Sequence, residues 1–398
     1  MADTTQKPGS SKKEQAKLKA EEARAKRKEE VLKEKKSGSD RIKDLEEEIK
    51  KTPYNKRTQH HVGLVKAKLA MLKEKEAQRG KGKGKTDGYS VKRSGDATVI
   101  MVGFPSAGKS SLLNQLTNAN SPVGDYEFTT LSVIPGLLEH KQAKIQVLDV
   151  PGIVHGAASG RGRGKEVLSV MQNADLAMIL VDTLRPNAYP VIMKEIREAH
   201  LRLNKKRPDV KITKKVKDGI RIGKTVRLPE LRDDTIKGIC KEFGISNADI
   251  LIRSVINADD LIDVLEANKR YIPAITVLNK IDLVSKERLD EIKKEINPDV
   301  LVSASQGVGI EEVKDVIFNH LEFIRIWCKE AGKKADMTVP LILREGATIE
   351  TMCRKLHKDF VTKFKFARVW GPSAKFDGQV LMLKHELKDN DVVELHIR

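Results

Sequence analysis

The sequence predicts an α/β protein with a parallel-rich sheet, preceded by a helical hairpin and followed by a small module of mixed strands. Three observations support this fold class. From residue 97 onwards, short apolar runs alternate with helical stretches, which is typical of a parallel sheet with helices on both faces. Between residues 40 and 78, apolar residues recur at helical intervals on both sides of Pro53. From residue 338 onwards, short strand-like runs surround one helical stretch.

Length and composition limit the class of protein. The chain has 398 residues, enough for two to four domains at about 150 residues each. Its 75 Lys and Arg against 56 Asp and Glu give a formal net charge of +19, which favours polyanionic partners such as RNA. The three cysteines have no paired spacing, which excludes a disulfide scaffold and is typical of a reducing compartment. No apolar run approaches the roughly 20 residues that cross a bilayer, so we expect no membrane segment. We also expect the protein to be cytoplasmic and monomeric.

The N-terminal part is highly charged. Residues 1–37 are mainly Lys, Glu, Ala, Gln and Arg, which predicts a charged extension that is either a solvated helix or a basic arm that binds phosphates. Residues 38–96 contain the helical hairpin, and the alternating Gly and Lys of 79–85 predict a flexible basic linker after it.

The predicted α/β domain covers residues 97–322. Buried strands are expected at 97–102, 145–150, 176–182 and 275–278. Residues 184–270 interrupt the alternation of strands and helices. Since residues 202–227 contain 11 basic and 2 acidic side chains, they are too polar for a core, and we interpret 184–270 as an inserted basic α+β domain.

The last predicted unit covers residues 323–398. Its strands are expected at 339–343, 366–370, 379–383 and 392–397, with one helix at 349–364. It contains no residue pattern with a chemistry of its own. We therefore interpret it as a small α+β interaction module.

A glycine-rich loop between the first expected strand and the following helix carries the clearest chemical pattern. Its sequence fits G-x4-G-K-S, in which backbone N–H groups surround phosphates, the lysine reaches the β- and γ-oxygens and the serine hydroxyl binds Mg²⁺. The N-terminus of the helix adds positive potential beneath the phosphates. The predicted nucleotide-binding residues are Gly103, Phe104, Pro105, Ser106, Ala107, Gly108, Lys109 and Ser110, followed by Ser111.

Asp149-Val-Pro-Gly152 ends the second apolar strand. A carboxylate at this end of a strand can hold Mg²⁺ through water, and Gly152 after Pro151 leaves a backbone N–H free for the γ-phosphate. The alternative is an ordinary Pro-Gly turn. Because the phosphate-binding loop lies upstream, we predict that Asp149 and the turn belong to the same site.

Asn279-Lys-Ile-Asp282 follows another apolar strand. The carboxylate of Asp282 can accept hydrogen bonds from both N1–H and the exocyclic amine of guanine, a donor pair that adenine lacks. We expect Asn279 to brace the loop and the stem of Lys280 to cover the base. Further along, a short loop suited to contact the guanine carbonyl through its backbone contains Ser303, Ala304 and Ser305.

Phe128-Thr-Thr130 lies between the glycine-rich loop and Asp149. A threonine there can complete Mg²⁺ coordination while the γ-phosphate is present, and loss of that phosphate would release the loop. The alternative is a pair of threonines in a strand.

These elements occur in an order that resembles the Obg-like branch of translation-factor GTPases. Three segments are more similar still to the developmentally regulated GTP-binding (DRG) family: Asp125-Tyr-Glu-Phe-Thr-Thr-Leu131, Asp149-Val-Pro-Gly-Ile-Val-His-Gly-Ala-Ala158, and the helical stretch Asn55-Lys-Arg-Thr-Gln-His-His-Val-Gly-Leu-Val-Lys-Ala-Lys-Leu69. Near the C-terminus, Ala367-Arg-Val-Trp-Gly371 resembles that family's TGS module, a small β-grasp fold.

The resemblance implies a P-loop GTPase domain of the Obg type over 97–322 and a TGS domain over 323–398. It also implies that Thr130 is the threonine that binds Mg²⁺, and that the ligands are GTP or GDP with Mg²⁺. The implied role is that of a translation factor on stalled or slowed ribosomes. In relatives from eukaryotes a dedicated protein partner stimulates the GTPase, and the resemblance suggests such a partner here.

Ile153 occupies the position at which Ras-type GTPases have the glutamine that orients the attacking water. Isoleucine cannot hydrogen-bond water, so we expect slow intrinsic hydrolysis. The family is similar in having a hydrophobic residue there, and some relatives use K⁺ near the phosphates. Those relatives have Asn where this chain has Ser106, a weaker ligand, and we predict K⁺ stimulation on this resemblance.

Basic clusters predict contact with structured RNA rather than stacking on single strands, since aromatic residues make up only 4% of the chain. One cluster follows the Asp149 segment closely, and we expect it to couple ribosome contact to hydrolysis. The predicted contact residues are Arg161, Arg163, Lys165, Lys205, Lys206, Arg207, Lys214 and Lys215.

The sequence is compatible with three functions. The first is a ribosome-associated, Mg²⁺-dependent GTPase that releases GDP and phosphate. The second is an RNA-binding scaffold in which GTP is a structural or slowly hydrolysed ligand, an alternative that Ile153 favours. The third is an ATPase, which Asp282 disfavours because relatives that prefer ATP have altered this element.

Overall fold

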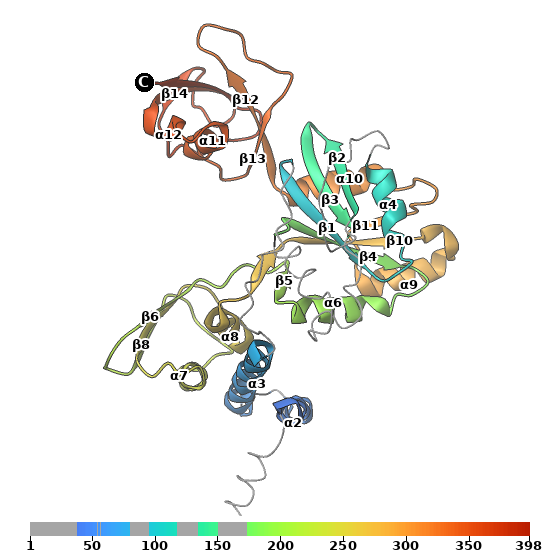
Figure 1. Cartoon of the computed structure of the whole chain (residues 1–398), viewed down its shortest axis with the longest axis vertical. Coiled ribbons are helices and arrows are strands. Elements are labelled where there is room, and N and C mark those ends of the chain that lie inside the picture. Colours follow the sequence, from blue (N-terminus) through green and yellow to red (C-terminus); the bar gives the residue numbers. More distant parts are fainter. Residues whose placement is uncertain (1–37, 54, 56, 80–94, 118–133, 150–172) are drawn as a thin grey trace, which may run out of the picture. The chain divides into compact units, whose positions relative to one another are not determined.

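The computed structural model describes residues 38–53, 55, 57–79, 95–117, 134–149 and 173–398 (Figure 1). These residues fall into two compact units. One unit comprises the described parts of 1–85 together with 208–268, and the other comprises the described parts of 86–207 together with 269–398. Within the described part of the chain, no helix is both long and apolar enough to cross a membrane.

The larger unit contains a six-stranded sheet in the order β11-β10-β4-β1-β3-β2. Neighbouring strands are parallel except for the edge strand β2, which pairs with β3 in antiparallel fashion. This confirms the parallel-rich sheet predicted from the alternation of strands and helices. The strands are β1 (Ala97–Gly103), β2 (Ile134–His140), β3 (Ala143–Asp149), β4 (Leu176–Asp182), β10 (Ala274–Asn279) and β11 (Val300–Val302).

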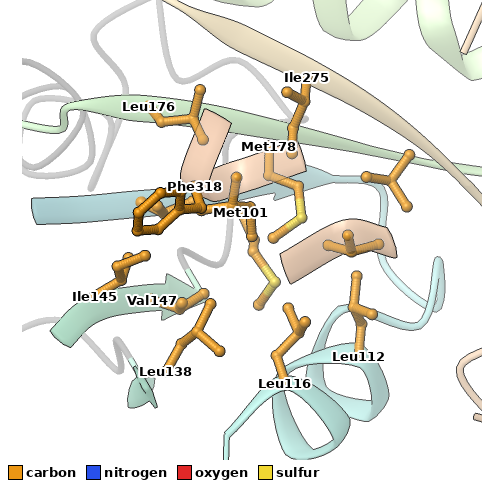
Figure 2. Close-up of a cluster of buried hydrophobic side chains, with 14 of the residues drawn as sticks. Met101, Leu112, Leu116, Leu138, Ile145, Val147, Leu176, Met178, Ile275 and Phe318 are labelled. Carbon is orange, nitrogen blue, oxygen red and sulfur yellow. The ribbon is translucent and has the colours of Figure 1, made fainter. Parts of the chain in front are cut away.

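Every residue of β1, β4 and β10 is buried, so these strands read in the sequence as continuous apolar runs. On one face of the sheet, side chains of α4 (Lys109–Leu116) and α10 (Ile310–His320) share a core with the strands. Figure 2 shows this cluster, in which Met101 and Met178 from the strands lie among Leu112, Leu116 and Phe318 from the helices.

The opposite face of the sheet is covered by α6 (Ala188–Glu198) and α9 (Lys286–Ile296). Ile192 and Ile292 from these helices pack with Ile100 and Ile179 of the strands. Two short strands, β5 (Leu201–Leu203) and β9 (Arg270–Ile272), pair in parallel.

The C-terminal part forms a five-stranded mixed sheet in the order β13-β12-β16-β14-β15. Its strands are β12 (Phe323–Lys329), β13 (Leu341–Arg344), β14 (Phe364–Trp370), β15 (Gln379–Leu381) and β16 (Val392–Ile397), and its helices are α11 (Ile349–Leu356) and α12 (Phe360–Lys363). The single helix expected over 349–364 is therefore wrong. His357 has extended backbone angles (φ −159°, ψ 143°) and ends α11 after two turns.

The smaller unit contains the hairpin of α2 (Gly38–Lys51) and α3 (Gln59–Arg79). It also contains a three-stranded sheet in the order β6-β8-β7, covered on one face by α7 and α8. The remaining bounds are β6 (Val210–Lys214), β7 (Ile220–Lys224), α7 (Asp233–Glu242), β8 (Ala248–Ile252) and α8 (Ala258–Glu266).

The hairpin and residues 208–268 share one hydrophobic core. Ala67 of α3 is fully buried against Ile239 of α7 and its neighbours. Polar contacts add to this packing: Lys66 Nζ lies 2.8 Å from a carboxylate oxygen of Asp259, and His60 lies 3.2 Å from the hydroxyl of Thr235. Residues 208–268, which pack with the hairpin, form a shorter segment than the expected insertion of 184–270, because α6 and β5 pack with the large sheet.

Candidate nucleotide-binding site

The glycine-rich loop lies between the end of β1 at Gly103 and the start of α4 at Lys109. Gly108 has a φ of +90°, and a Cβ atom added there would lie 2.3 Å from Nδ2 of Asn279. A Cβ on Gly103 would lie 2.6 Å from the carbonyl oxygen of Leu180 in the adjacent strand. Both positions therefore require glycine, one for its backbone angle and its close contact and the other for its close contact alone.

The loop is arranged to bind anions. It leads into the N-terminus of α4, whose first turn contains no acidic residue and whose first N–H groups have no partner within the helix. The ammonium group of Lys109 donates to the carbonyl oxygens of Gly103 and Phe104, each at 3.2 Å, so it lies back across the loop. A phosphate bound in the loop would provide a charged partner for this ammonium group in place of the two neutral carbonyls.

Asp149 ends β3 beside the loop. The hydroxyl of Ser110 donates to Oδ2 of Asp149 at 3.0 Å. The carboxylate is only 6% exposed, and its Oδ1 is buried with no hydrogen-bond partner among the described residues. A buried carboxylate oxygen beside a hydroxyl is an oxygen donor set of the kind Mg²⁺ prefers, so these residues fit the metal that the P-loop implies.

Asn279, the last residue of β10, connects three loops. It is 1% exposed, and its Nδ2 donates to the carbonyl oxygen of Ala107 in the glycine-rich loop at 2.9 Å. Its Oδ1 accepts from the backbone N–H of Lys280 at 2.8 Å and from that of Ala304 at 3.1 Å. One amide side chain therefore holds the phosphate-binding loop and both loops expected to contact the base, as predicted for a bracing residue.

Lys280 is held from β4. Its backbone has a φ of +66°, which is uncommon for a residue with a side chain. Its ammonium group donates to Oδ2 of Asp182 at 2.7 Å, and its carbonyl oxygen accepts from the hydroxyl of Thr183 at 2.8 Å. Asp182 also accepts from the backbone N–H of Leu184 at 2.9 Å, so its carboxylate is fixed at both oxygens.

Asp282 and the Ser303 loop complete the expected base site. Asp282 is exposed on a short 3₁₀ turn, Ile281–Leu283, immediately after β10. The loop after β11 is closed by an isolated bridge between Ser303 and Val308 and by a 3.1 Å contact between the hydroxyls of Ser303 and Ser305. Since β1, β3, β10 and β11 are parallel, all of these groups lie at the carboxyl edge of one sheet, where open α/β sheets bind ligands.

Several predicted residues lie outside the described residues: Thr130, Pro151, Gly152, Ile153, Arg161, Arg163 and Lys165. The other predicted RNA contacts are exposed. Lys205, Lys206 and Arg207 follow β5, Lys214 ends β6, and Lys215 lies 2.6 Å from a carboxylate oxygen of Asp249.

Sequence reasoning did not predict Asp182 and Thr183 as site residues. The sequence does show a carboxylate, Asp182, at the C-terminal end of an apolar strand, the same pattern that identified Asp149. It does not show that β4 lies between β1 and β10, which places Asp182 beside Lys280.

Family models match nearly the whole of residues 98–397. The model described as 50S ribosome-binding GTPase matches residues 98–215, and the model of the C-terminal region of that domain matches 217–323. The TGS domain model matches residues 324–397.

Individual relatives cover most of the chain. An uncharacterized GTP-binding protein of Methanocaldococcus jannaschii is 50% identical over 361 residues, which is 90% of this chain and 92% of the relative. Developmentally-regulated GTP-binding protein 1 of Xenopus laevis is 43% identical over 89% of this chain and 98% of its own length. Ribosome-interacting GTPase 1 of Saccharomyces cerevisiae is 43% identical with the same two coverages.

Proposed function

The chain belongs to the developmentally regulated GTP-binding protein family and is a P-loop GTPase, and we propose that it acts as a ribosome-associated translation factor. In this proposal it hydrolyses GTP to GDP and phosphate, requires Mg²⁺ and binds structured RNA, in the cytoplasm and as a monomer. The relative named ribosome-interacting GTPase 1 and the net charge of +19 support the ribosome role. The dedicated stimulating protein that the resemblance suggests is also part of the proposal.

The observation that carries the proposal is the arrangement around Asn279, which joins the phosphate-binding loop to the two loops of the base site. In this arrangement Asp282 recognises guanine while the stem of Lys280 covers the base. Lys109 and the N-terminus of α4 stabilise negative charge on the transferring phosphoryl group. Mg²⁺, held by Ser110 and Thr130 and through water by Asp149, would neutralise further phosphate charge.

The experiment that tests this function measures GTP turnover with and without ribosomes, together with sedimentation on ribosomes in GTP analogue, GDP or no nucleotide. Because isoleucine replaces the water-orienting glutamine, we expect slow intrinsic turnover that ribosomes accelerate by about tenfold or more, equivalent to about 1.4 kcal/mol of barrier. We also expect more protein to sediment with the GTP analogue than with GDP.

The second candidate function is an RNA-binding scaffold that turns GTP over rarely, and Ile153 is the residue that favours it. A scaffold would sediment with ribosomes equally in all nucleotide states and would show no acceleration of multiple-turnover phosphate release. That pair of results would replace the first function with the second.

We predict that Asp182→Asn weakens GTP binding by about tenfold while changing the maximal turnover rate little. The substitution removes the negative charge that holds the Lys280 ammonium group. Because the Asp182 side chain is only 11% exposed, solvent screens this ion pair weakly. A raised KM with an unchanged kcat is the expected result. Glu291→Gln, which removes an exposed partner of Arg288 in the same unit, is the matched control and should change neither parameter.

We propose that K⁺ stimulates turnover, and steady-state rates in KCl and NaCl at equal ionic strength test this. Ser106 has a φ of +64°, a left-handed conformation that asparagine adopts more readily than serine. We therefore expect Ser106→Asn to fit the loop without strain and to increase the ratio of the rate in KCl to the rate in NaCl. Equal rates in the two salts for both proteins would remove K⁺ from the mechanism.

A further inference from the structure

Among the residues that the structure describes, no helix covers the second face of the three-stranded sheet in the smaller unit. Side chains alternate along each strand, and Ile212, Ile222 and Ile250 point to the core shared with α7 and α8. The residues between them therefore point the opposite way, and the register places Lys211 opposite Leu251 and Arg221 opposite Asp249. Apart from Leu251, this outer face carries no large apolar side chain; it exposes Lys211 and Arg221 and carries no aromatic side chain.

Carboxylates neutralise only part of the positive charge around this sheet. Lys215 pairs with Asp249 at 2.6 Å, Lys224 pairs with Asp233 at 2.5 Å, and Arg221 lies 3.8 Å from Asp218. In contrast, three exposed lysines on the edge strand β6 and the turn after it form no ion pair within the described residues. These are Lys211, Lys214 and Lys217. By the same alternation Lys211 points to the outer face and Lys214 to the opposite one, so these lysines flank the edge strand rather than share one face.

The turn between β6 and β7 is held in one conformation by Asn247. Its Oδ1 accepts from the backbone N–H of Gly219 at 2.8 Å, and its Nδ2 donates to the carbonyl oxygen of Val216 at 3.2 Å. Its own carbonyl oxygen accepts from the backbone N–H of Lys215 at 2.9 Å. Asp218 and Gly219 both have positive φ, at +83° and +71°, which reverses the chain direction within this short turn.

This turn presents an apolar side chain between lysines. Val216 is 96% exposed, the highest value among the large exposed hydrophobic residues of the described chain. It contributes nothing to the core of its own unit. Since the backbone of the turn is held at three points, the valine is displayed at a defined position, with Lys215 before it and Lys217 after it.

We propose that Lys211, Lys214, Val216 and Lys217, here called the β6 tip surface, bind duplex RNA across its minor groove. This inference rests on the proposed function and identifies the surface that would contact RNA. The unpaired lysines suit phosphates, and the lack of aromatic side chains disfavours stacking on unpaired bases. The minor groove of A-form RNA is wide and shallow, so a short rigid turn with a small apolar tip can reach its sugar edges.

The test is titration of the full chain with an RNA duplex of about 20 base pairs, long enough for two successive minor grooves, over a series of salt concentrations. The triple substitution Lys211→Gln, Lys214→Gln, Lys217→Gln is expected to reduce the slope of log affinity against log salt by about 2.7, or about 0.9 for each phosphate that a lysine no longer neutralises. The matched control, Lys43→Gln, Lys237→Gln, Lys241→Gln, removes the same charge from exposed helical positions of the same unit and should leave most of the slope.

A second pair of variants tests the tip itself. Val216→Asp should weaken binding to RNA about tenfold or more, because it places a carboxylate against the backbone phosphates. Val255→Asp introduces the same group at another exposed valine of the unit, which is 66% exposed, and should have little effect. Intrinsic GTP turnover should be unchanged in all these variants, since none of the residues lies in the nucleotide site.

The outcomes separate this inference from the function on which it rests. If the chain binds duplex RNA and the two triple variants bind alike, the β6 tip surface is not the contact and the inference fails, while RNA binding stands. Equal affinity for DNA and RNA duplexes of one sequence would overturn the minor-groove contact.

If the chain binds neither duplex RNA nor ribosomes, the proposed function itself fails. If ribosome binding needs the three lysines but duplex RNA is not bound, the partner is a ribosomal protein and the inference is wrong.

Discussion

Replacement of Asp282 by Asn is expected to reduce the use of GTP by about a hundredfold or more and to raise the use of xanthosine triphosphate. In the proposed function, the carboxylate accepts two hydrogen bonds from the donor edge of guanine. A carboxamide turns one of these acceptors into a donor, which then meets a guanine donor in a site built for hydrogen bonding. Xanthine presents a carbonyl where guanine has its amine, so it matches the carboxamide.

Asp282 is well placed for this test because it is exposed on the 3₁₀ turn after β10, so its substitution should not disturb the core. The measurement is kcat/KM for GTP and for xanthosine triphosphate in the wild-type and variant proteins. Asp290→Asn, at an exposed position on the nearby helix α9, is the matched control. Unchanged GTP use in the Asp282 variant would contradict the assignment of this residue to base recognition.

Much of the nucleotide site could be predicted from the sequence because its signals are local. The glycine-rich loop stands between an apolar run and a helix, and its lysine and serine follow at fixed spacing. Asp149 and Asn279 each follow or end a short apolar run that is typical of a buried strand. In a parallel sheet such strand ends meet at one edge, so local patterns alone brought these residues together.

The contacts that could not be predicted depend on pairings far apart in the chain. Asp182 and Lys280 meet because β4 and β10 are adjacent in the sheet, although 98 positions separate them. The same applies to the hairpin: the side-chain amide of Gln59 donates to the backbone of Glu230, 171 positions away. Apolar residues at helical spacing predict a helix at α3 but do not say which partner covers it.

The C-terminal module illustrates a different limit. Apolar residues at helical spacing run through 349–364, and in the structure a capping box of Thr348 and Thr351 begins a helix there. The residues that follow Leu356 include no Gly or Pro that would end the helix there. The extended backbone at His357 and the short helix α12 that follows reflect how the chain must turn to enter β14, which is a property of the whole module.

Asn279→Asp is the second substitution with a large expected effect, because it changes one atom at the point where three loops meet. The Nδ2 that donates to the Ala107 carbonyl becomes an oxygen, so two acceptors would face each other at 2.9 Å in a site that is 1% exposed. Loss of this buried pairing costs about 1–3 kcal/mol, and burial of the new charge adds to the cost. We expect the affinity for both GTP and GDP to fall by about tenfold to a hundredfold.

The pH dependence of this variant distinguishes loss of the hydrogen bond from general unfolding. Burial and the facing carbonyl both disfavour the charged form, so the new carboxyl group should have a raised pKa. When protonated, it can donate to Ala107 as the amide did. Nucleotide affinity measured by titration calorimetry should therefore recover as the pH falls through that pKa, whereas Asn319→Asp, at an exposed position on α10, should bind normally at every pH. Full affinity at neutral pH for Asn279→Asp would show that the connection between Asn279 and the glycine-rich loop does not organise the site.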